Sequence, residues 1–127
     1  MTHNANLDRI RLLVLDVDGV LTDGRITLDA DGREIKTFDV RDGTGMKYWK
    51  RVGGLLALIT GRGSPAVEHR ARELNVDAVR MHAKNKLPVL EEVLSELDVP
   101  AGQTAVMGDD LTDLPMMRHC ALGITVP

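Results

Sequence analysis

Two aspartates at the end of an apolar run are the first residues whose types and spacing suggest chemistry. Asp16 and Asp18 stand two apart within residues 12–22, which read LLVLDVDGVLT. An apolar run that ends in Asp-x-Asp-Gly is typical of a buried strand that leaves its sheet at a glycine turn. Side chains two apart on an extended segment point the same way, so both carboxylates are expected to face one small volume. A hard divalent cation would balance them there, although a solvated turn remains an open alternative.

Three further polar groups follow predicted strands or open a predicted helix. They are Thr60, Gly61 and Arg62, then Lys86, and finally Asp109, Asp110 and Asp113. A lysine in the first turn of a helix is disfavoured by the helix dipole, which indicates a specific role for Lys86, although an ordinary surface lysine remains possible. Carboxylates for a cation, a hydroxyl with backbone donors for an anion, and fixed positive charges together suit phosphate chemistry. A carboxylate could act as the nucleophile through an aspartyl-phosphate.

Apolar runs and turn signals predict the elements that would position these residues. Strands are expected at 10–16, 55–59, 77–81, 104–107 and 121–125, and helices at 42–51, 65–74, 85–97 and 114–117. Ser64 and Pro65 mark the start of the second helix as N-cap and first helical residue. This alternation predicts an α/β fold with one doubly wound, mostly parallel, Rossmann-like sheet. Ligands of such sheets bind at the carboxyl ends of the strands.

The segment after the first strand predicts an exposed β-hairpin flap at residues 24–38. Two short strand-like runs, 24–28 and 34–38, flank the turn sequence Asp-Ala-Asp-Gly at residues 29–32. A two-stranded hairpin is marginal alone and needs a surface on which to pack. The hairpin is therefore expected to cover the site or to contact another subunit, and the chain is expected to form oligomers.

Composition sets the limits within which this interpretation must fit. With 127 residues and 43% hydrophobic content, the chain is predicted to form a single domain over residues 1–127. Its net charge of -3, with mixed signs along the chain, predicts neither a nucleic-acid nor a membrane partner. Cys120 is the sole cysteine, and the opening residues MTHNANLDR lack the apolar core of a signal peptide. A cytoplasmic location is therefore expected.

The motifs resemble those of the haloacid dehalogenase superfamily of phosphohydrolases, in order and spacing. The matches are DVDGV at 16–20, the threonine at 60, the lysine at 86 and GDDLTD at 108–113. The resemblance implies Asp16 as nucleophile, Asp18 as general acid and base, and Thr60 with Lys86 as phosphate ligands. It also implies that magnesium (Mg2+) binds the Asp16 carboxylate, the Asp18 backbone carbonyl and Asp109. Asp110 and Asp113 would support the metal or its waters.

Within that superfamily the chain is similar to the 3-deoxy-D-manno-octulosonate 8-phosphate phosphatases. These are a small branch without a cap domain that serves lipopolysaccharide precursor synthesis. The similarity lies in LTDGRI at 21–26, FDVRDGTGMK at 38–47, ITGR at 59–62, VEHRARELNV at 67–76 and GDDLTDLPMM at 108–117. It implies Mg2+-dependent hydrolysis of a sugar-acid phosphate. It further implies a homotetramer built through the hairpin, in which a neighbouring subunit completes each active site.

The same resemblance implies a set of substrate contacts. They map to Asp18, Asp39, Val40, Arg41, Asp42, Gly43, Lys47, Gly61, Arg62, Arg70 and Lys86. Arg62 is the most informative, because a guanidinium can hold a carboxylate through two hydrogen bonds. The related nonulosonate 9-phosphate phosphatases tend to have glutamate at this position. They remain an alternative, and so does a non-catalytic phosphate-binding module.

The chain departs from the family pattern at three places. His82 and Ala83 stand where Gln-Gly is frequent, and Lys47 stands where arginine is common. The family's C-terminal segment, which includes a glycine-rich tail near the active site, has no counterpart in these 127 residues.

Overall fold

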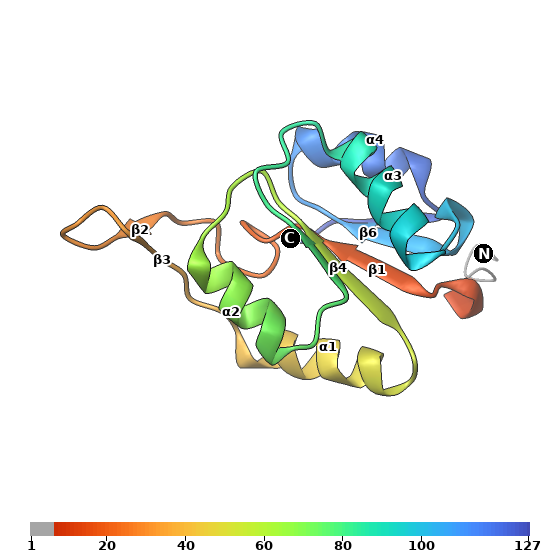
Figure 1. Ribbon diagram of the computed structural model, residues 1–127, viewed down its shortest axis with the longest axis horizontal. Helices are drawn as coiled ribbons and strands as arrows, with labels where there is room; N and C mark the ends of the chain where they lie inside the picture. The colour runs from red at the N-terminus through yellow and green to blue at the C-terminus, as the bar shows by residue number, and fades with distance from the viewer. Residues whose placement is uncertain (1–6) are drawn as a thin grey trace.

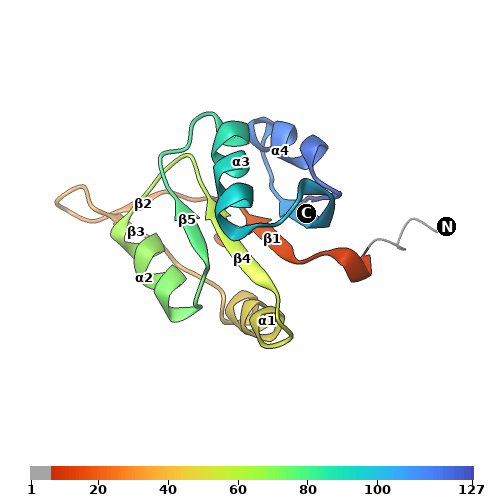
Figure 2. The same ribbon diagram turned by 45° about the vertical axis from the view of Figure 1, so that its right-hand side comes forward.

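The fold of residues 7–127, seen in a computed structural model, is built on a five-stranded parallel sheet (Figures 1 and 2). The strands lie in the order β5-β4-β1-β6-β7. Their bounds are β1 Leu12–Leu15, β4 Leu55–Ile59, β5 Ala78–Arg80, β6 Thr104–Met107 and β7 Leu122–Ile124. All four neighbouring pairs are parallel. The predicted α/β class and parallel sheet are therefore confirmed.

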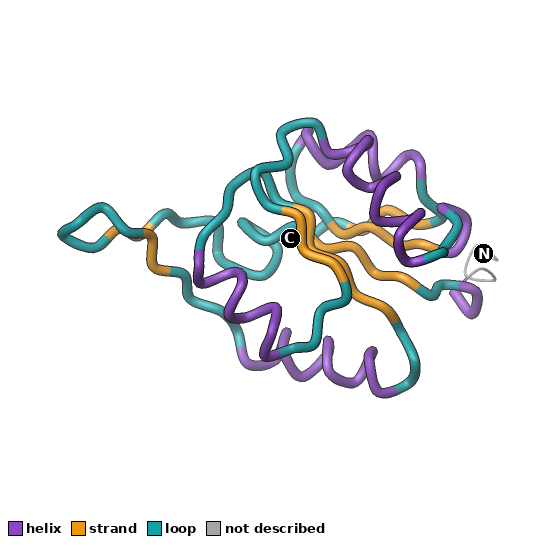
Figure 3. Tube along the Cα trace, viewed as in Figure 1, coloured by secondary structure: helices purple, strands orange, loops and turns teal. Residues whose placement is uncertain are grey.

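Helices cover both faces of this sheet, as a doubly wound fold requires (Figure 1). They are α1 Val40–Arg51, α2 Pro65–Glu73, α3 Lys86–Leu97 and α4 Leu114–His119, with short 3-10 helices at Ala101–Gln103 and Leu111–Asp113. In the views of Figures 1 and 3, α3 and α4 lie above the sheet and α1 and α2 below it.

The central strands alternate their side chains between two separate hydrophobic clusters. Leu56 and Leu58 of β4 pack with residues of α1 and α2, whereas Ala57 and Ile59 pack with residues of α3 and α4. Successive residues of a strand face opposite sides, so a strand buried on both faces must be apolar throughout. Both clusters end at the carboxyl edge of the sheet, where the apolar runs give way to the polar residues singled out above.

Local sequence signals predict most ends of the sheet strands and helices to within one residue, but three ends differ by two. The first strand begins at Leu12 rather than at residue 10, α4 ends at His119 rather than at residue 117, and α1 begins early. The strands at 55–59 and 104–107 and the Ser64 cap of α2 are as predicted. The first helix was expected from residue 42 but begins at Val40, because Asp39 caps it by accepting a hydrogen bond from the Arg41 amide at 2.7 Å. Asp42 therefore lies in the first turn.

The predicted hairpin is present and extends away from the sheet (Figures 1 and 3). Its strands β2 (Thr27–Leu28) and β3 (Glu34–Ile35) pair antiparallel. The turn is closed by Asp29, whose carboxylate accepts hydrogen bonds from the amides of Asp31 and Arg33, both at 2.9 Å. The chain between β1 and α1 thus forms a flap in place of a cap domain within the described residues.

Two sequence predictions extend into residues 1–6, which lie outside the described part of the chain. These are the single domain from residue 1 and the opening without a signal peptide. Between residues 7 and 127, no helix is both long and apolar enough to cross a bilayer.

Candidate active site

A pocket of about 500 Å³ lies at the carboxyl ends of the strands. It includes seven residues singled out from the sequence: Asp16, Asp18, Gly61, Arg62, Lys86, Asp109 and Asp110. Four other residues complete its lining: Gly24, Ala83, Lys84 and Thr112. Loops after β1, β4, β5 and β6 thus converge on one volume, as expected for a parallel sheet.

Asp16 follows β1 directly and is almost entirely buried. Its amide donates to the Met107 carbonyl at 3.1 Å, which continues the pairing of β1 with β6 for one residue. Its carboxylate accepts a hydrogen bond from the Val17 amide at 2.8 Å. Burial raises the pKa of Asp16 to about 6, an effect that the nearby Lys86 ammonium opposes and the Asp113 charge reinforces. The fold therefore holds a carboxylate that is costly to ionise without further positive charge.

Lys86 supplies one such charge from the first residue of α3. Its ammonium lies 2.6 Å from Oδ1 of Asp113 and 3.3 Å from Oδ1 of Asp16, and the side chain is buried. Burial alone would lower the pKa of Lys86, but the Asp113 hydrogen bond and the two carboxylate charges outweigh it, so the pKa is raised. These two partners explain why a lysine occupies the first turn of a helix.

The loop after β6 is organised around Asp113, which is fully buried. Oδ2 of Asp113 accepts hydrogen bonds from the amides of Asp109 at 3.1 Å and Asp110 at 3.2 Å. Asp110 in turn caps the following 3-10 helix by accepting from the Leu111 amide at 2.6 Å. Asp113 therefore orients both the Asp109 loop and the Lys86 ammonium.

Three of these carboxylates form a group suited to a metal ion. Asp16, Asp109 and Asp113 each offer one oxygen, and these oxygens lie within 4.8 Å of one another. Oxygen-only donors at close range fit a hard divalent cation such as magnesium. Gly19, with φ of +86°, lies so near that a Cβ there would overlap the Asp109 carboxylate. A glycine is thus needed beside this group.

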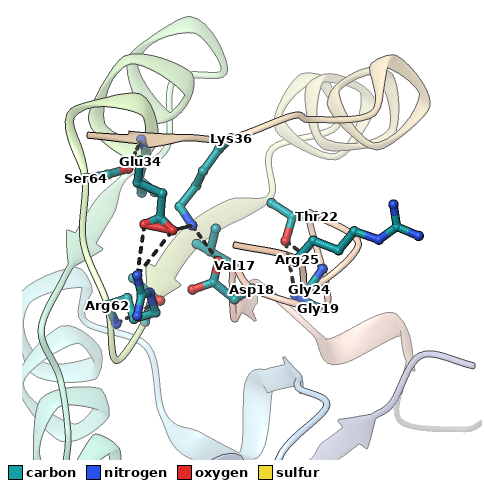
Figure 4. Close-up of polar contacts among 12 residues, drawn as sticks. Val17, Asp18, Gly19, Thr22, Gly24, Arg25, Glu34, Lys36, Arg62 and Ser64 are labelled. Carbon is teal, nitrogen blue, oxygen red and sulfur yellow. Dashed lines mark hydrogen bonds and ion pairs between the residues drawn. The ribbon is translucent and has the colours of Figure 1, made fainter. Parts of the chain in front are cut away.

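Asp18 shares the pocket of Asp16, as expected, but its carboxylate pairs with the hairpin. It lines the same pocket as Asp16, but among the described residues it lies outside the three-carboxylate group. The strand ends at Leu15 and a turn closes on Val17, so the alternation of an extended segment does not apply here. Instead, Asp18 Oδ1 accepts a hydrogen bond from the Lys36 ammonium of the hairpin at 2.5 Å (Figure 4).

The Thr60-Gly61-Arg62 turn forms another wall of the site. Thr60 is buried, and its hydroxyl accepts a hydrogen bond from the Arg62 amide at 3.4 Å. Gly61 and the half-exposed Arg62 line the pocket itself. Nη2 of Arg62 lies 3.4 Å from both carboxylate oxygens of Glu34 (Figure 4). The turn thus presents backbone and guanidinium donors together.

The remaining predicted substrate contacts lie apart from this pocket within one chain. They are Asp39, Val40, Arg41, Asp42, Gly43, Lys47 and Arg70. Asp39 and Asp42 line a neighbouring hollow of about 380 Å³. Arg70 donates to the Asp39 carbonyl at 3.4 Å and approaches so closely that a side chain at residue 43 would overlap it. Burial, and then the Asp39 charge, raise the pKa of Asp42.

Sequence reasoning missed Glu34 and Lys36, whose side chains connect the hairpin to the site. Each makes contacts with residues that the loops after other strands provide. The available signal was two opposite charges at alternate positions of a predicted strand, which places them on one side of the hairpin. The identity of their distant partners was not accessible from that pattern.

Comparison with known proteins supports the pattern read from these residues. A family model described as haloacid dehalogenase-like hydrolase matches residues 81–127. The 3-deoxy-D-manno-octulosonate 8-phosphate phosphatase of Haemophilus influenzae is 37% identical over 120 residues, which are 94% of this chain and 67% of that protein. The chain belongs to the haloacid dehalogenase-like hydrolases.

Other members of this group show the same similarity. The Escherichia coli K12 phosphatase of that name is 39% identical over 96% of this chain, and the match spans 65% of its own length. The crystal structure of the Moraxella catarrhalis phosphatase, in complex with magnesium, phosphate and KDO, has a TM-score of 0.94 at 38% identity. That match covers 98% of this chain and 72% of the other. The resemblance to this branch of the superfamily is thereby confirmed.

Proposed function

We propose that the protein hydrolyses the phosphate ester of a sugar acid, with 3-deoxy-D-manno-octulosonate 8-phosphate as its substrate. The main observation that supports this proposal is the buried Asp16 carboxylate, which pairs with Lys86 and lies beside Asp109 in the strand-end pocket. The names of the relatives supply the substrate class. The strand-end site supplies the chemistry.

The side chains of this site fit a two-step phosphoryl transfer. In the first step, an oxygen of Asp16 attacks phosphorus, the bond from phosphorus to the sugar oxygen breaks, and Asp18 donates a proton to that oxygen. In the second step, water attacks the phosphorus of the aspartyl-phosphate and gives its proton to Asp18. The bond between phosphorus and the Asp16 oxygen breaks, which releases inorganic phosphate and restores the carboxylate.

Magnesium is the cofactor in this proposal. Asp16 and Asp109 would hold it with their carboxylates and Asp18 with its backbone carbonyl, while Asp110 and Asp113 support the loop. When bound, it supplies positive charge that neutralises the phosphate oxygens. Asp113 acts mainly through Lys86 and the loop amides, because its two oxygens are already engaged there.

Fixed positive charges and donors would orient the substrate. Lys86 and Gly61, which line the pocket, would hold the phosphate together with Thr60, which is buried beside them, and the half-exposed Arg62 would face the rest of the substrate. A guanidinium there suits the substrate carboxylate, because planar paired donors match its two oxygens. Both candidate acids carry a carboxylate, so the preference for the eight-carbon acid rests on the resemblance, in which arginine at this position is typical of the octulosonate branch and glutamate of the nonulosonate branch.

The hairpin is proposed to assemble the chain into a homotetramer. Three large apolar side chains on it are more than half exposed: Ile26, Leu28 and Ile35. A second copy would cover them and bring its own residues 39–43, with Lys47 and Arg70, toward this pocket. This arrangement accounts for predicted substrate contacts that a single chain keeps away from its own site. A cytoplasmic location and a single domain over residues 1–127 complete the proposal.

Phosphate release from a substrate panel tests the function. The panel holds 3-deoxy-D-manno-octulosonate 8-phosphate, a nonulosonate 9-phosphate and p-nitrophenyl phosphate, each with magnesium and with EDTA. We expect magnesium-dependent release with the highest kcat/KM for the eight-carbon acid. Preference for the nine-carbon acid would support the alternative phosphatase. Binding of phosphate without release from any ester would support the non-catalytic module.

A further inference from the structure

A row of four charged side chains, joined by ion pairs, connects the hairpin to the pocket (Figure 4). Its members are Asp18, Lys36, Glu34 and Arg62. Lys36 lies 2.5 Å from Asp18 and 3.2 Å from Glu34, and Glu34 lies 3.4 Å from Arg62. From Asp18 to Arg62, acidic and basic side chains therefore alternate. Asp18 and Arg62 line the pocket, whereas Glu34 and Lys36 belong to the hairpin segment.

The two hairpin residues of this row, Glu34 and Lys36, are more buried than the two residues that line the pocket. The Lys36 side chain is 3% exposed and the Glu34 side chain 9%, against 52% for Arg62. Burying a carboxylate is unfavourable unless opposite charges and hydrogen bonds compensate it. Lys36 and Arg62 provide that compensation from two sides of Glu34. Glu34 is thus held from two sides, and it contacts the more exposed partner, Arg62.

Glu34 holds Arg62 by one corner of the guanidinium. Both carboxylate oxygens approach Nη2. Within residues 7–127, Nε and Nη1 of Arg62 make no hydrogen bond or ion pair of their own. A guanidinium has five N–H donors, so with Nη2 held by Glu34 the Nε and Nη1 donors each stay free to donate a hydrogen bond to a ligand. Fixing the side chain in advance lowers the entropy that a ligand must overcome on binding.

We propose that Glu34 is a specificity-determining positioning residue, which holds Arg62 at the pocket so that its remaining donors receive the substrate carboxylate. Lys36 holds Glu34 in place through an ion pair at 3.2 Å while it also contacts Asp18. The inference rests on the proposed function, since it assigns Arg62 to a substrate carboxylate. It adds that the hairpin contributes to substrate selection within its own chain.

The direction of the change in KM distinguishes a Glu34 that positions Arg62 from a Glu34 that competes with the substrate for it. If Glu34 competed with the substrate for Arg62, removing its charge would lower KM for a carboxylated substrate. If Glu34 positions Arg62, the same change raises that KM. A phosphate ester without a carboxylate separates this effect from damage to the reacting centre.

Steady-state kinetics of Glu34→Gln with two substrates make the test. We expect KM for 3-deoxy-D-manno-octulosonate 8-phosphate to rise about tenfold or more, the usual size of a lost charge-assisted contact, with a much smaller change for p-nitrophenyl phosphate. Glu92→Gln, the same change at an exposed position on α3, is the control and should match the wild type. Circular dichroism of both variants checks that they fold.

A double variant tests whether Glu34 acts through Arg62. Glu34→Gln combined with Arg62→Gln should have about the same KM for the sugar acid as Arg62→Gln alone. Additive losses, an unchanged KM in Glu34→Gln, or a lowered KM would each overturn the proposal while leaving the hydrolytic function standing. If the wild-type protein released phosphate from neither substrate, both the proposed function and this inference would be wrong.

Discussion

The ammonium of Lys86, at the start of α3, lies 2.6 Å from Oδ1 of Asp113, in the loop that carries Asp109, and both side chains are buried. Removing one member of a buried ion pair costs about 3–5 kcal/mol. Asp16 would remain beside Lys86 in Asp113→Ala, but the amides of Asp109 and Asp110 would also lose their acceptor. We therefore expect Asp113→Ala to lower the free energy of unfolding by that amount. Urea denaturation of the metal-free protein measures it.

Asp110→Ala provides the comparison for that experiment. Asp110 is exposed and caps the 3-10 helix through the Leu111 amide, so its loss should cost about 1 kcal/mol. Equal losses in the two variants would show that the pairing of Lys86 with Asp113 is not what stabilises this loop.

Asp16→Asn should change how stability depends on pH in the metal-free protein. Burial raises the pKa of Asp16 from 3.8 to about 6, so between these values the folded state binds a proton that the unfolded state has released. The contribution of protonated Asp16 to the free energy of unfolding is therefore present at low pH and is lost as pH rises from 3.8 to about 6. Asparagine does not titrate, so the Tm of Asp16→Asn relative to wild type should rise across it. Thermal melts in EDTA measure this difference, and a constant difference would contradict the buried-carboxylate account.

Gly19→Ala should weaken magnesium binding. Its φ of +86° disfavours any side chain, and the new Cβ would displace the Asp109 carboxylate. A ligand that binds the folded state raises Tm, so the magnesium-induced Tm increase of wild type should be largely lost. Gly32→Ala is the matched control, because Gly32 has φ of +81° but no atom near its Cβ position. An undiminished increase in Gly19→Ala would exclude Asp109 as a ligand.

Leu28→Lys should reduce the size of the assembly. Leu28 is 58% exposed on the hairpin, and burying a charge in an apolar subunit contact is unfavourable. Size-exclusion chromatography with light scattering is expected to show a tetramer for wild type and smaller species for the variant. Val52→Lys, at a 77% exposed apolar residue after α1, should remain tetrameric. If Leu28→Lys has the wild-type mass, the hairpin is not the assembly surface.

The sequence identified the elements whose ends carry strong local signals. Ser64 and Pro65 marked the start of α2 correctly, because a cap and a first-turn proline act within a few residues. The start of α1 was misplaced because Asp39 and Asp42 are both acceptable near a helix start. Asp39 is the cap because its carboxylate lies 2.7 Å from the Arg41 amide, a distance that the sequence does not show.

The site was predictable to the extent that it depends on strand ends. Asp16, Arg62 and Asp109 come together because parallel strands finish at one edge. The orientation of Asp18 was not predictable, since it depends on a turn that begins where the strand stops. Lys36 and Glu34 form their contacts through the path of the hairpin, which local patterns do not encode.

Phosphate release by Asp16→Asn with magnesium and 3-deoxy-D-manno-octulosonate 8-phosphate is the most direct test of the central claim. An amide is a poor nucleophile toward phosphorus, so we predict rapid release by the wild type and by Glu92→Gln and none above background by a folded Asp16→Asn. Release by Asp16→Asn at the wild-type rate would contradict the aspartyl-phosphate mechanism.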